Sequence, residues 1–176
     1  MTTEFLLERE VRGVLMLLTP VNRLCMRVML HTGLRVGDAV SLPAKLAKTG
    51  RCTIKEGKTG KVRRVSVPEP LRRELAAIAG REWLFPSRRS QTGHITRQAV
   101  WKDVKRASKA MRMEQNVGPH SARKVYAVDL LLKYGDLPRV QRALHHDDVG
   151  TTLIYAMADK ALESRRDSRG NRYVAQ

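Results

Sequence analysis

Hydrophobic residues recur at helical spacing in the first third of the chain. Thr19 followed by Pro20 predicts the start of one helix, because a threonine hydroxyl can cap a helix and proline fits its first position. Gly33 can adopt the left-handed conformation that closes a helix, so we expect this helix to end there. A preceding helix, which Thr2 or Thr3 could cap, is predicted from apolar residues three and four positions apart: Leu6, Leu7, Val11, Val14, Leu15 and Leu18.

The periodicity changes from about 3.6 to 2 between residues 51 and 67. Residues 52–55 and 62–67 are predicted to form two strands, because β-branched and polar residues alternate in them. The turn between them, residues 57–61, contains two glycines and two lysines. We therefore expect a β-hairpin with a basic tip, which Pro68 ends.

Helical spacing returns after the hairpin. An extended piece is expected at residues 83–86 and a polar loop at residues 87–93. The fold class is therefore mainly α with a small antiparallel β-sheet (α+β). The further helices are predicted at residues 69–79, 96–111, 119–135, 137–144 and 151–166, with a short amphipathic turn at residues 36–42.

The length of 176 residues suits one globular domain. We expect residues 1–176 to form a single domain, with a core of about residues 1–166 and a polar tail at residues 167–176. No apolar run approaches the roughly 18 residues that a membrane span needs, so we expect no membrane association. Cys25 and Cys52 share no metal-ligand spacing and are too few for a disulfide framework, which suits a reducing cytoplasm.

The charge changes the picture most. The chain contains 34 Lys and Arg against 17 Asp and Glu, a net charge of +17 with a pI near 10.8. Such an excess favours a polyanionic partner. The aromatic content is only 5%, without an aromatic-basic strand that would stack unpaired bases, so contact with the phosphates of a duplex is favoured. A ribosomal or chromatin-type basic protein, or a merely solubilising surface, has the same composition.

Polar residues with potential chemistry follow one another in a fixed order along the predicted elements. An arginine and an aspartate follow the helix-closing glycine, a lysine lies at the hairpin tip, and a histidine and an arginine begin a helix. A histidine then ends a helix, and a tyrosine follows nine residues later. These residues are Arg35 and Asp38, Lys58, His120 and Arg123, His146, and Tyr155.

This order and spacing resembles the catalytic domain of tyrosine recombinases, the phage-integrase family. The family pattern is an arginine in a T-G-L-R-x-x-E box, a lysine on a β-hairpin, H-x-x-R, a G-H box and a C-terminal tyrosine. The match runs from the first helix to Tyr155 and implies the tyrosine-recombinase catalytic-domain (DNA breaking-rejoining enzyme) fold. The chain differs in having Asp38 for the common glutamate and His145 for the usual glycine. Either His145 or His146 could therefore point inward, and the spacing to Tyr155 favours His146.

The resemblance implies roles that fit the residue types. Arg35 and Arg123 would clamp the scissile phosphate, because a guanidinium offers a planar fork of donors to its oxygens. Tyr155 would be the nucleophile that forms a 3′-phosphotyrosyl bond. That bond conserves energy, so no cofactor and no metal is expected.

The remaining roles concern protons and support. Lys58 would deliver a proton to the departing 5′ oxygen. His120 would accept a proton or donate to the phosphate, His146 would hydrogen-bond the phosphate, and Asp38 would support the site. Lys55 and Lys61 compete with Lys58 for the proton role.

As a whole, the resemblance implies a site-specific recombinase or integrase that cuts and rejoins DNA, including DNA of mobile elements, in the cytoplasm at the nucleoid. Further recombinase protomers would be partners in a synaptic tetramer on DNA. Members of the family normally carry an N-terminal core-binding domain, which we expect to be absent from this chain.

Other interpretations remain for each residue and for the whole. Arg35 or Arg123 alone could be a surface phosphate contact, and Tyr155 alone a half-buried packing residue. A type IB topoisomerase shares the tyrosine attack but releases supercoils. A non-catalytic basic DNA-binding regulator would need none of these residues.

Overall fold

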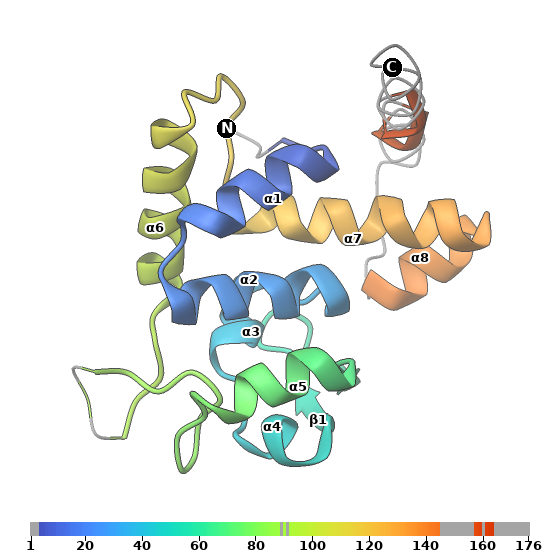
Figure 1. Ribbon diagram of the computed structural model, residues 1–176. Coiled ribbons are helices and arrows are strands. Elements are labelled where there is room, and N and C mark those ends of the chain that lie inside the picture. Colours follow the sequence, from blue (N-terminus) through green and yellow to red (C-terminus); the bar gives the residue numbers. More distant parts are fainter. Residues whose placement is uncertain (1–3, 89, 91, 145–156, 160, 164–176) are drawn as a thin grey trace.

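The computed structural model describes residues 4–88, 90, 92–144, 157–159 and 161–163 (Figure 1). Over these residues the chain is mainly helical with one small antiparallel sheet, as the sequence predicts. The elements are α1 (Glu8–Leu17), α2 (Pro20–Thr32), α3 (Val36–Val40), α4 (Lys45–Thr49), β1 (Arg51–Lys55), β2 (Val62–Ser66), α5 (Glu69–Ala76), α6 (Arg97–Ala110), α7 (Pro119–Tyr134) and α8 (Leu137–Leu144).

Helix α2 lies at the centre of the fold. It packs against α7 and also contacts α1, α3, α5 and α6. In Figure 1 it separates α1 and α7 from the part that contains α3, α4, α5 and the sheet. Its buried residues, among them Leu24, Val28 and Met29, belong to the main hydrophobic core. The candidate residues Arg35 and Arg123 therefore lie at the start of α3 and on α7, two elements that pack against this central helix.

Both ends of α2 fall where the sequence places them, but one cap differs. Gly33 closes the helix in the left-handed conformation at φ 65°, as predicted. Thr19 precedes the helix, but the prediction that its hydroxyl caps the helix is wrong. The Thr19 hydroxyl instead donates a hydrogen bond to Asp103 Oδ2 at 2.7 Å, because a buried carboxylate on α6 lies within reach.

Helix α1 begins later than a cap at Thr2 or Thr3 would require, so that prediction is also wrong. The N-cap residue is Leu7, whose backbone N–H donates to the Glu10 carboxylate at 2.7 Å. A glutamate at the third helical position can satisfy a free amide in this way without a capping hydroxyl. Helix α6, in contrast, has the predicted cap, since Thr96 Oγ1 accepts from Ala99 N at 3.1 Å.

The hairpin forms as predicted, with Cys52 opposite Val65 and Ile54 opposite Arg63. These inward positions alternate with exposed ones along both strands. Arg63 is therefore buried, because it shares a face with Val65. The turn contains Gly60 in the left-handed conformation at φ 67°.

Two helices near the hairpin differ from expectation. Helix α4 was not predicted, because five residues are too few to show helical periodicity, yet it buries Leu46 and Ala47. Helix α5 ends at Ala76, three residues earlier than predicted. The chain then continues as a turn in which Ile78 N and Ala79 N both donate to the Leu75 carbonyl.

Helices α7 and α8 follow the predicted boundaries and form a second hydrophobic cluster, to which the described residues 157–159 and 161–163 add Ala158 and Ala161. These two segments are helical. The rest of the helix predicted at residues 151–166, and the tail at residues 167–176, lie outside the described residues. Within the described part of the chain, no helix is both long and apolar enough to span a membrane.

Candidate functional site

The T-G-L-R segment places the first candidate arginine beside α7. A Cβ atom at Gly33 would lie 2.3 Å from Cδ1 of Tyr126 on α7, and its φ of 65° is one that side chains disfavour. Only glycine therefore allows the end of α2 to approach α7 this closely. The approach brings the Gly33 carbonyl next to Arg123, and Arg35 follows as the residue that precedes α3.

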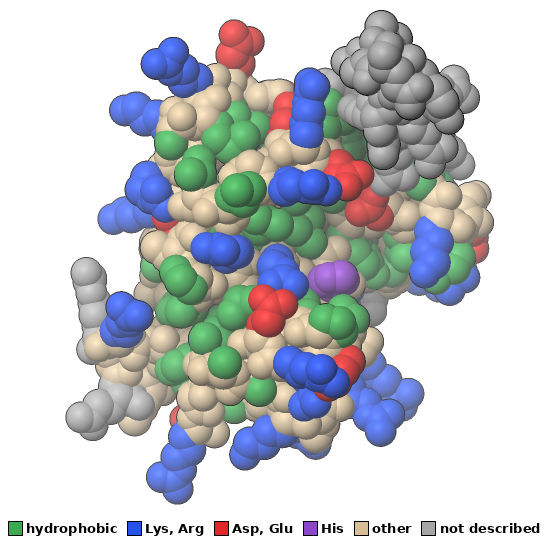
Figure 2. All heavy atoms as spheres, viewed as in Figure 1, with side chains coloured by type: hydrophobic (Ala, Val, Ile, Leu, Met, Phe, Trp, Pro, Cys, Tyr) green, Lys and Arg blue, Asp and Glu red, His purple; other side chains and the backbone are tan. Residues whose placement is uncertain are grey.

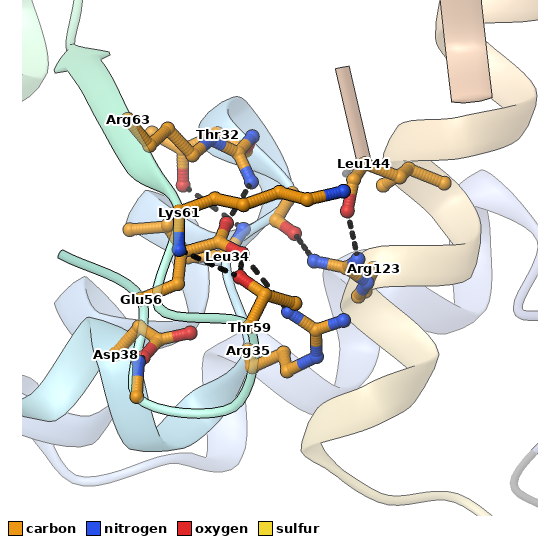
Figure 3. Close-up of polar contacts among 12 residues, drawn as sticks. Thr32, Leu34, Arg35, Asp38, Glu56, Thr59, Lys61, Arg63, Arg123 and Leu144 are labelled. Carbon is orange, nitrogen blue, oxygen red and sulfur yellow. Dashed lines mark hydrogen bonds and ion pairs between the residues drawn. The ribbon is translucent and has the colours of Figure 1, made fainter. Parts of the chain in front are cut away.

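Arg123 is buried and joins two helix ends (Figure 3). Its Nη1 donates to the Gly33 carbonyl and its Nη2 to the Leu144 carbonyl, both at 2.5 Å. A helix ends with carbonyls that lack partners, and Arg123 satisfies one at the end of α8. The guanidinium is thus fixed, and it holds the last described residue before His145 and His146.

Arg35 is mostly buried, with 16% of its side chain exposed. Its Nη1 lies 3.2 Å from Oε2 of Glu56, which precedes the hairpin turn. Glu56 is 1% exposed, and its Oε1 lies 3.1 Å from Nη1 of Arg63. Arg63 also donates to the Thr32 carbonyl. Figure 3 shows these side chains gathered between the hairpin and the end of α2.

Asp38 supports the hairpin turn. Its Oδ1 accepts a hydrogen bond from Gly57 N at 2.8 Å. Its Oδ2 is buried and has no hydrogen-bond partner among the described residues. The carboxylate that pairs with Arg35 is therefore Glu56, while Asp38 ties α3 to the turn that carries Lys58.

Arg35, Arg63 and Arg123, together called the arginine pocket below, create an electrostatic environment that favours an anion. Burial, together with the neighbouring Arg35 and Arg63, lowers the pKa of Arg123 to about 10, and Glu56 and Asp38 offset this in part. Arg123 remains protonated at neutral pH. Three guanidinium groups thus lie near two carboxylates, of which Glu56 pairs with Arg35 and Arg63, and a bound anion would relieve the mutual repulsion of the arginines.

The three lysines of the hairpin differ in placement. Lys58 is exposed in the turn, and Lys55 is exposed at the end of β1. Lys61 is exposed at the end of the turn, directly before β2. In Figure 3 its side chain extends toward Arg123 and Leu144. The turn that carries Lys58 is thus held by Asp38 and Glu56, the second of which pairs with Arg35.

The remaining candidates are placed only in part. His120 is exposed at the second position of α7, one helical turn before Arg123. His145, His146 and Tyr155 lie outside the described residues. The structure therefore brings together Arg35, Asp38, Arg123 and the hairpin of Lys58.

Sequence reasoning missed Glu56 and Arg63. Arg63 could have been found from strand alternation, because it lies two residues before the inward-facing Val65. A buried arginine is expected to have an acceptor because burying an unpaired charge is costly, and Glu56 is the acidic residue nearest the hairpin turn. The sequence holds this signal, although it does not identify which arginines share the carboxylate.

The described part of the chain contains neither a cluster of metal ligands nor an exposed thiol. No three His, Cys, Asp or Glu side chains there lie close enough together to hold a metal ion. Cys25 and Cys52 are both buried and unbonded to each other. Burial raises the pKa of the Cys25 thiol to about 12, which keeps it from acting as a nucleophile.

The fold is that of tyrosine-recombinase catalytic domains. The XerH site-specific recombinase, in a pre-cleavage complex with its difH substrate, matches 86% of this chain with a TM-score of 0.64 and 26% identity, over 49% of its own length. A lambda integrase dimer bound to a COC′ core site matches 90% of the chain with a TM-score of 0.70 and 19% identity, over 49% of its length. The second likeness concerns the fold alone.

The chain belongs to the phage integrase family, whose model matches residues 5–161. It is 39% identical over 134 residues to the tyrosine recombinase XerD of Rhizobium meliloti, a match that covers 70% of this chain and 43% of that protein. XerD of Bradyrhizobium diazoefficiens is 35% identical over 147 residues, covering 74% of this chain and 46% of the relative. The chain thus spans about half the length of these curated relatives.

Proposed function

We propose that this chain is the catalytic part of a site-specific DNA recombinase, which cuts and rejoins duplex DNA through a covalent 3′-phosphotyrosyl intermediate. The observation that carries the proposal is the pocket of Arg35, Arg63 and Arg123, in which positive charge exceeds negative charge. Family membership over residues 5–161 supports it.

In this proposal Arg35 and Arg123 stabilise the scissile phosphate. Charge on the nonbridging oxygens increases as the nucleophile attacks, and a fixed guanidinium stabilises that charge without reorganising. Arg123 is fixed by two backbone carbonyls and Arg35 by Glu56. Preorganised cations of this kind replace the metal that many phosphoryl-transfer enzymes use, so the reaction needs no cofactor.

Tyr155 is the proposed nucleophile. Its hydroxyl attacks the phosphorus, and the bond to the 5′ oxygen of the next nucleotide breaks. Lys58 donates the proton that this oxygen takes up, since it lies on the turn beside the pocket. His120 and His146 contact the phosphate or accept a proton. The reverse attack by a 5′ hydroxyl releases the tyrosine and reseals the strand.

The proposed partners are double-stranded DNA and further protomers on DNA. The net charge of +17 supports binding to a polyanion. On the face shown in Figure 2, lysine and arginine side chains are spread over the surface with acidic ones between them. The XerH recombinase is known in complex with its difH substrate before and after cleavage, with 26% and 27% identity to this chain.

A trapping assay tests this function. The 176-residue chain is incubated with nicked duplex DNA, whose short cleaved strand diffuses away and prevents resealing. The mixture is then denatured and separated. We expect a protein band shifted by covalently attached DNA, and we expect Tyr155→Phe to abolish it while DNA binding is retained, because only the hydroxyl is lost.

Tyr134→Phe is the matched control. Tyr134 is an exposed tyrosine at the end of α7, and its substitution should leave the covalent band unchanged. A covalent band that persists in Tyr155→Phe would move the assignment to Tyr173. Absence of the band in the unchanged chain, with DNA binding retained, would favour a non-catalytic DNA-binding regulator.

A further inference from the structure

Glu56 is the residue that connects the two halves of the arginine pocket. Its side chain is almost completely buried, and both carboxylate oxygens are used. Oε1 lies 3.1 Å from Arg63 Nη1, and Oε2 lies 3.2 Å from Arg35 Nη1. Burying a carboxylate between two guanidinium groups is costly unless each ion is paired. This arrangement therefore needs a reason beyond filling the core.

The contact with Glu56 holds the Arg35 guanidinium in place. In the proposed function this guanidinium must also keep N–H donors available for the phosphate. A guanidinium has five N–H donors. Within the described residues, the bond to Glu56 is the only hydrogen bond of the Arg35 side chain, which keeps 16% of its surface exposed. Glu56 thus holds Arg35 through one nitrogen and leaves the remaining donors available.

The same residue anchors the hairpin turn. Its backbone N–H donates to the Lys61 carbonyl at 3.0 Å, and its carbonyl accepts from Gly60 N at 2.8 Å. The Thr59 hydroxyl donates to Oε2 of Glu56 at 2.8 Å. One residue therefore connects Arg35 with the turn that carries Lys58.

We propose that Glu56 is a positioning residue for DNA cleavage, which sets the guanidinium of Arg35 and the Lys58 turn relative to one another. This inference rests on the proposed function of the site. It assigns to Glu56 an effect on the rate of strand cleavage, separate from its effect on folding. Glu56 itself does not touch the DNA.

The test uses single-turnover cleavage of nicked duplex at saturating concentrations of the full chain. At saturating protein the rate constant reports the geometry of the site, and circular dichroism of the same sample reports the fraction of folded protein. Glu56→Gln keeps the volume and removes the charge that holds Arg35. We expect a fall of roughly 10–100-fold in the rate constant, since misplacing a reacting group by about 1 Å can have an effect of this size.

Glu69→Gln is the matched control. Glu69 is an exposed glutamate that pairs with Arg72 and Arg73 on α5, away from the pocket. Its rate constant should equal that of the unchanged chain. The affinity for DNA, measured by titration, should be similar in all three proteins, because the Glu56 side chain is buried and has no exposed surface to offer a phosphate.

A second variant covers the case in which Glu56→Gln does not fold. Glu56→Met combined with Arg63→Met replaces the buried pair by apolar side chains, a change that proteins often tolerate, and it still leaves Arg35 without its carboxylate. The same fall in rate constant is expected. A rate constant equal to or above that of the unchanged chain, in a sample whose protein is folded, would overturn the inference. Absence of cleavage by the unchanged chain would instead overturn the proposed function.

Discussion

Two buried carboxylates organise two different regions of this molecule. Asp103 lies on α6 at the junction with α2, and Glu56 lies at the hairpin beside the arginine pocket. Each is almost fully buried and each accepts several hydrogen bonds. Their partners differ, and this difference separates a cluster with balanced charge from one with surplus positive charge.

Asp103 is surrounded mainly by neutral donors. Its Oδ2 accepts from the backbone N–H of Thr19 at 2.9 Å, from the Thr19 hydroxyl and from Asn22 Nδ2 at 2.8 Å. Among the described residues its single cationic partner is Arg106, whose side chain is 55% exposed. One negative charge meets one solvated positive charge, so this cluster attracts no further ion.

Glu56 pairs with the guanidinium groups of Arg35 and Arg63. The guanidinium of Arg123 lies close enough to interact electrostatically with both of these arginines. Here cations outnumber carboxylates in a largely dry environment. A polar cluster with balanced charge joins elements of the fold, whereas one with surplus buried charge is prepared for a ligand of the opposite sign.

The largest expected effect is on the cleavage rate, which should respond to an arginine of the pocket but not to an arginine of the Asp103 cluster. Arg35→Ala should lower the single-turnover rate of strand cleavage by about 10²–10³-fold, equivalent to about 2.7–4 kcal/mol, because a preorganised donor to the developing charge is lost. Arg106→Ala removes an arginine from the Asp103 cluster and should leave the rate constant within about twofold. Equal losses in the two variants would show that the pocket is no more functional than the junction.

Substitution of Asp103 should lower the free energy of unfolding and leave the cleavage rate unchanged. Asp103→Ala leaves the Thr19 and Asn22 donors unpaired at the start of α2, so we expect a loss of about 3 kcal/mol in the free energy of unfolding. That loss corresponds to a fall in Tm of roughly 6–12 °C for a protein of this size. Calorimetry measures it. The cleavage rate constant of the protein that remains folded should not change.

The pH dependence of stability sharpens the same contrast. Burial raises the pKa of Asp103, but hydrogen bonds from Asn22 and Thr19 and the bond to Arg106 outweigh it, so the pKa lies below the ordinary value of 3.8. A lowered pKa contributes stability above the unfolded value and loses it as the pH falls through the folded value. In urea unfolding, the free energy of unfolding of the unchanged chain should therefore exceed that of Asp103→Asn. This difference should be constant from pH 7 to about pH 5 and should decrease below pH 4.

The smallest expected effect is that of a chelator. If guanidinium groups supply the charge stabilisation, cleavage in excess EDTA should proceed at an unchanged rate, because no metal takes part. Gel quantification of the covalent product over time measures this. Loss of activity in EDTA that magnesium restores would contradict the arginine mechanism.

Much of the fold was predictable from the sequence, because it depends on local signals. Proline after Thr19 and glycine at positions 33 and 135 mark helix ends, and alternation marks the hairpin. The caps were less predictable. The Thr19 hydroxyl could bond locally or to a distant acceptor, and only the tertiary structure brings Asp103, 84 residues away, within reach.

The site was predictable to the extent that its motifs are local. The structure places Arg35, Asp38 and Arg123 near one another beside the hairpin that carries Lys58, whereas their catalytic roles remain predictions. The pairing of Arg35 with Glu56 was not predicted, because it connects residues 21 positions apart through a turn whose shape the sequence does not specify. The roles of His146 and Tyr155 remain predictions from the motif.

The central claim is that this chain attacks DNA through Tyr155, and peptide mapping tests it most directly. The covalent complex with nicked duplex is digested with nuclease and trypsin, and the modified peptide is identified by its mass. Cleavage after Arg142 and Lys160 gives a peptide of residues 143–160 that contains Tyr155 as its single tyrosine. We predict that this peptide carries the 3′-phosphonucleotide. A nucleotide on a peptide containing Tyr126, Tyr134 or Tyr173, or the absence of any modified peptide, would contradict the claim.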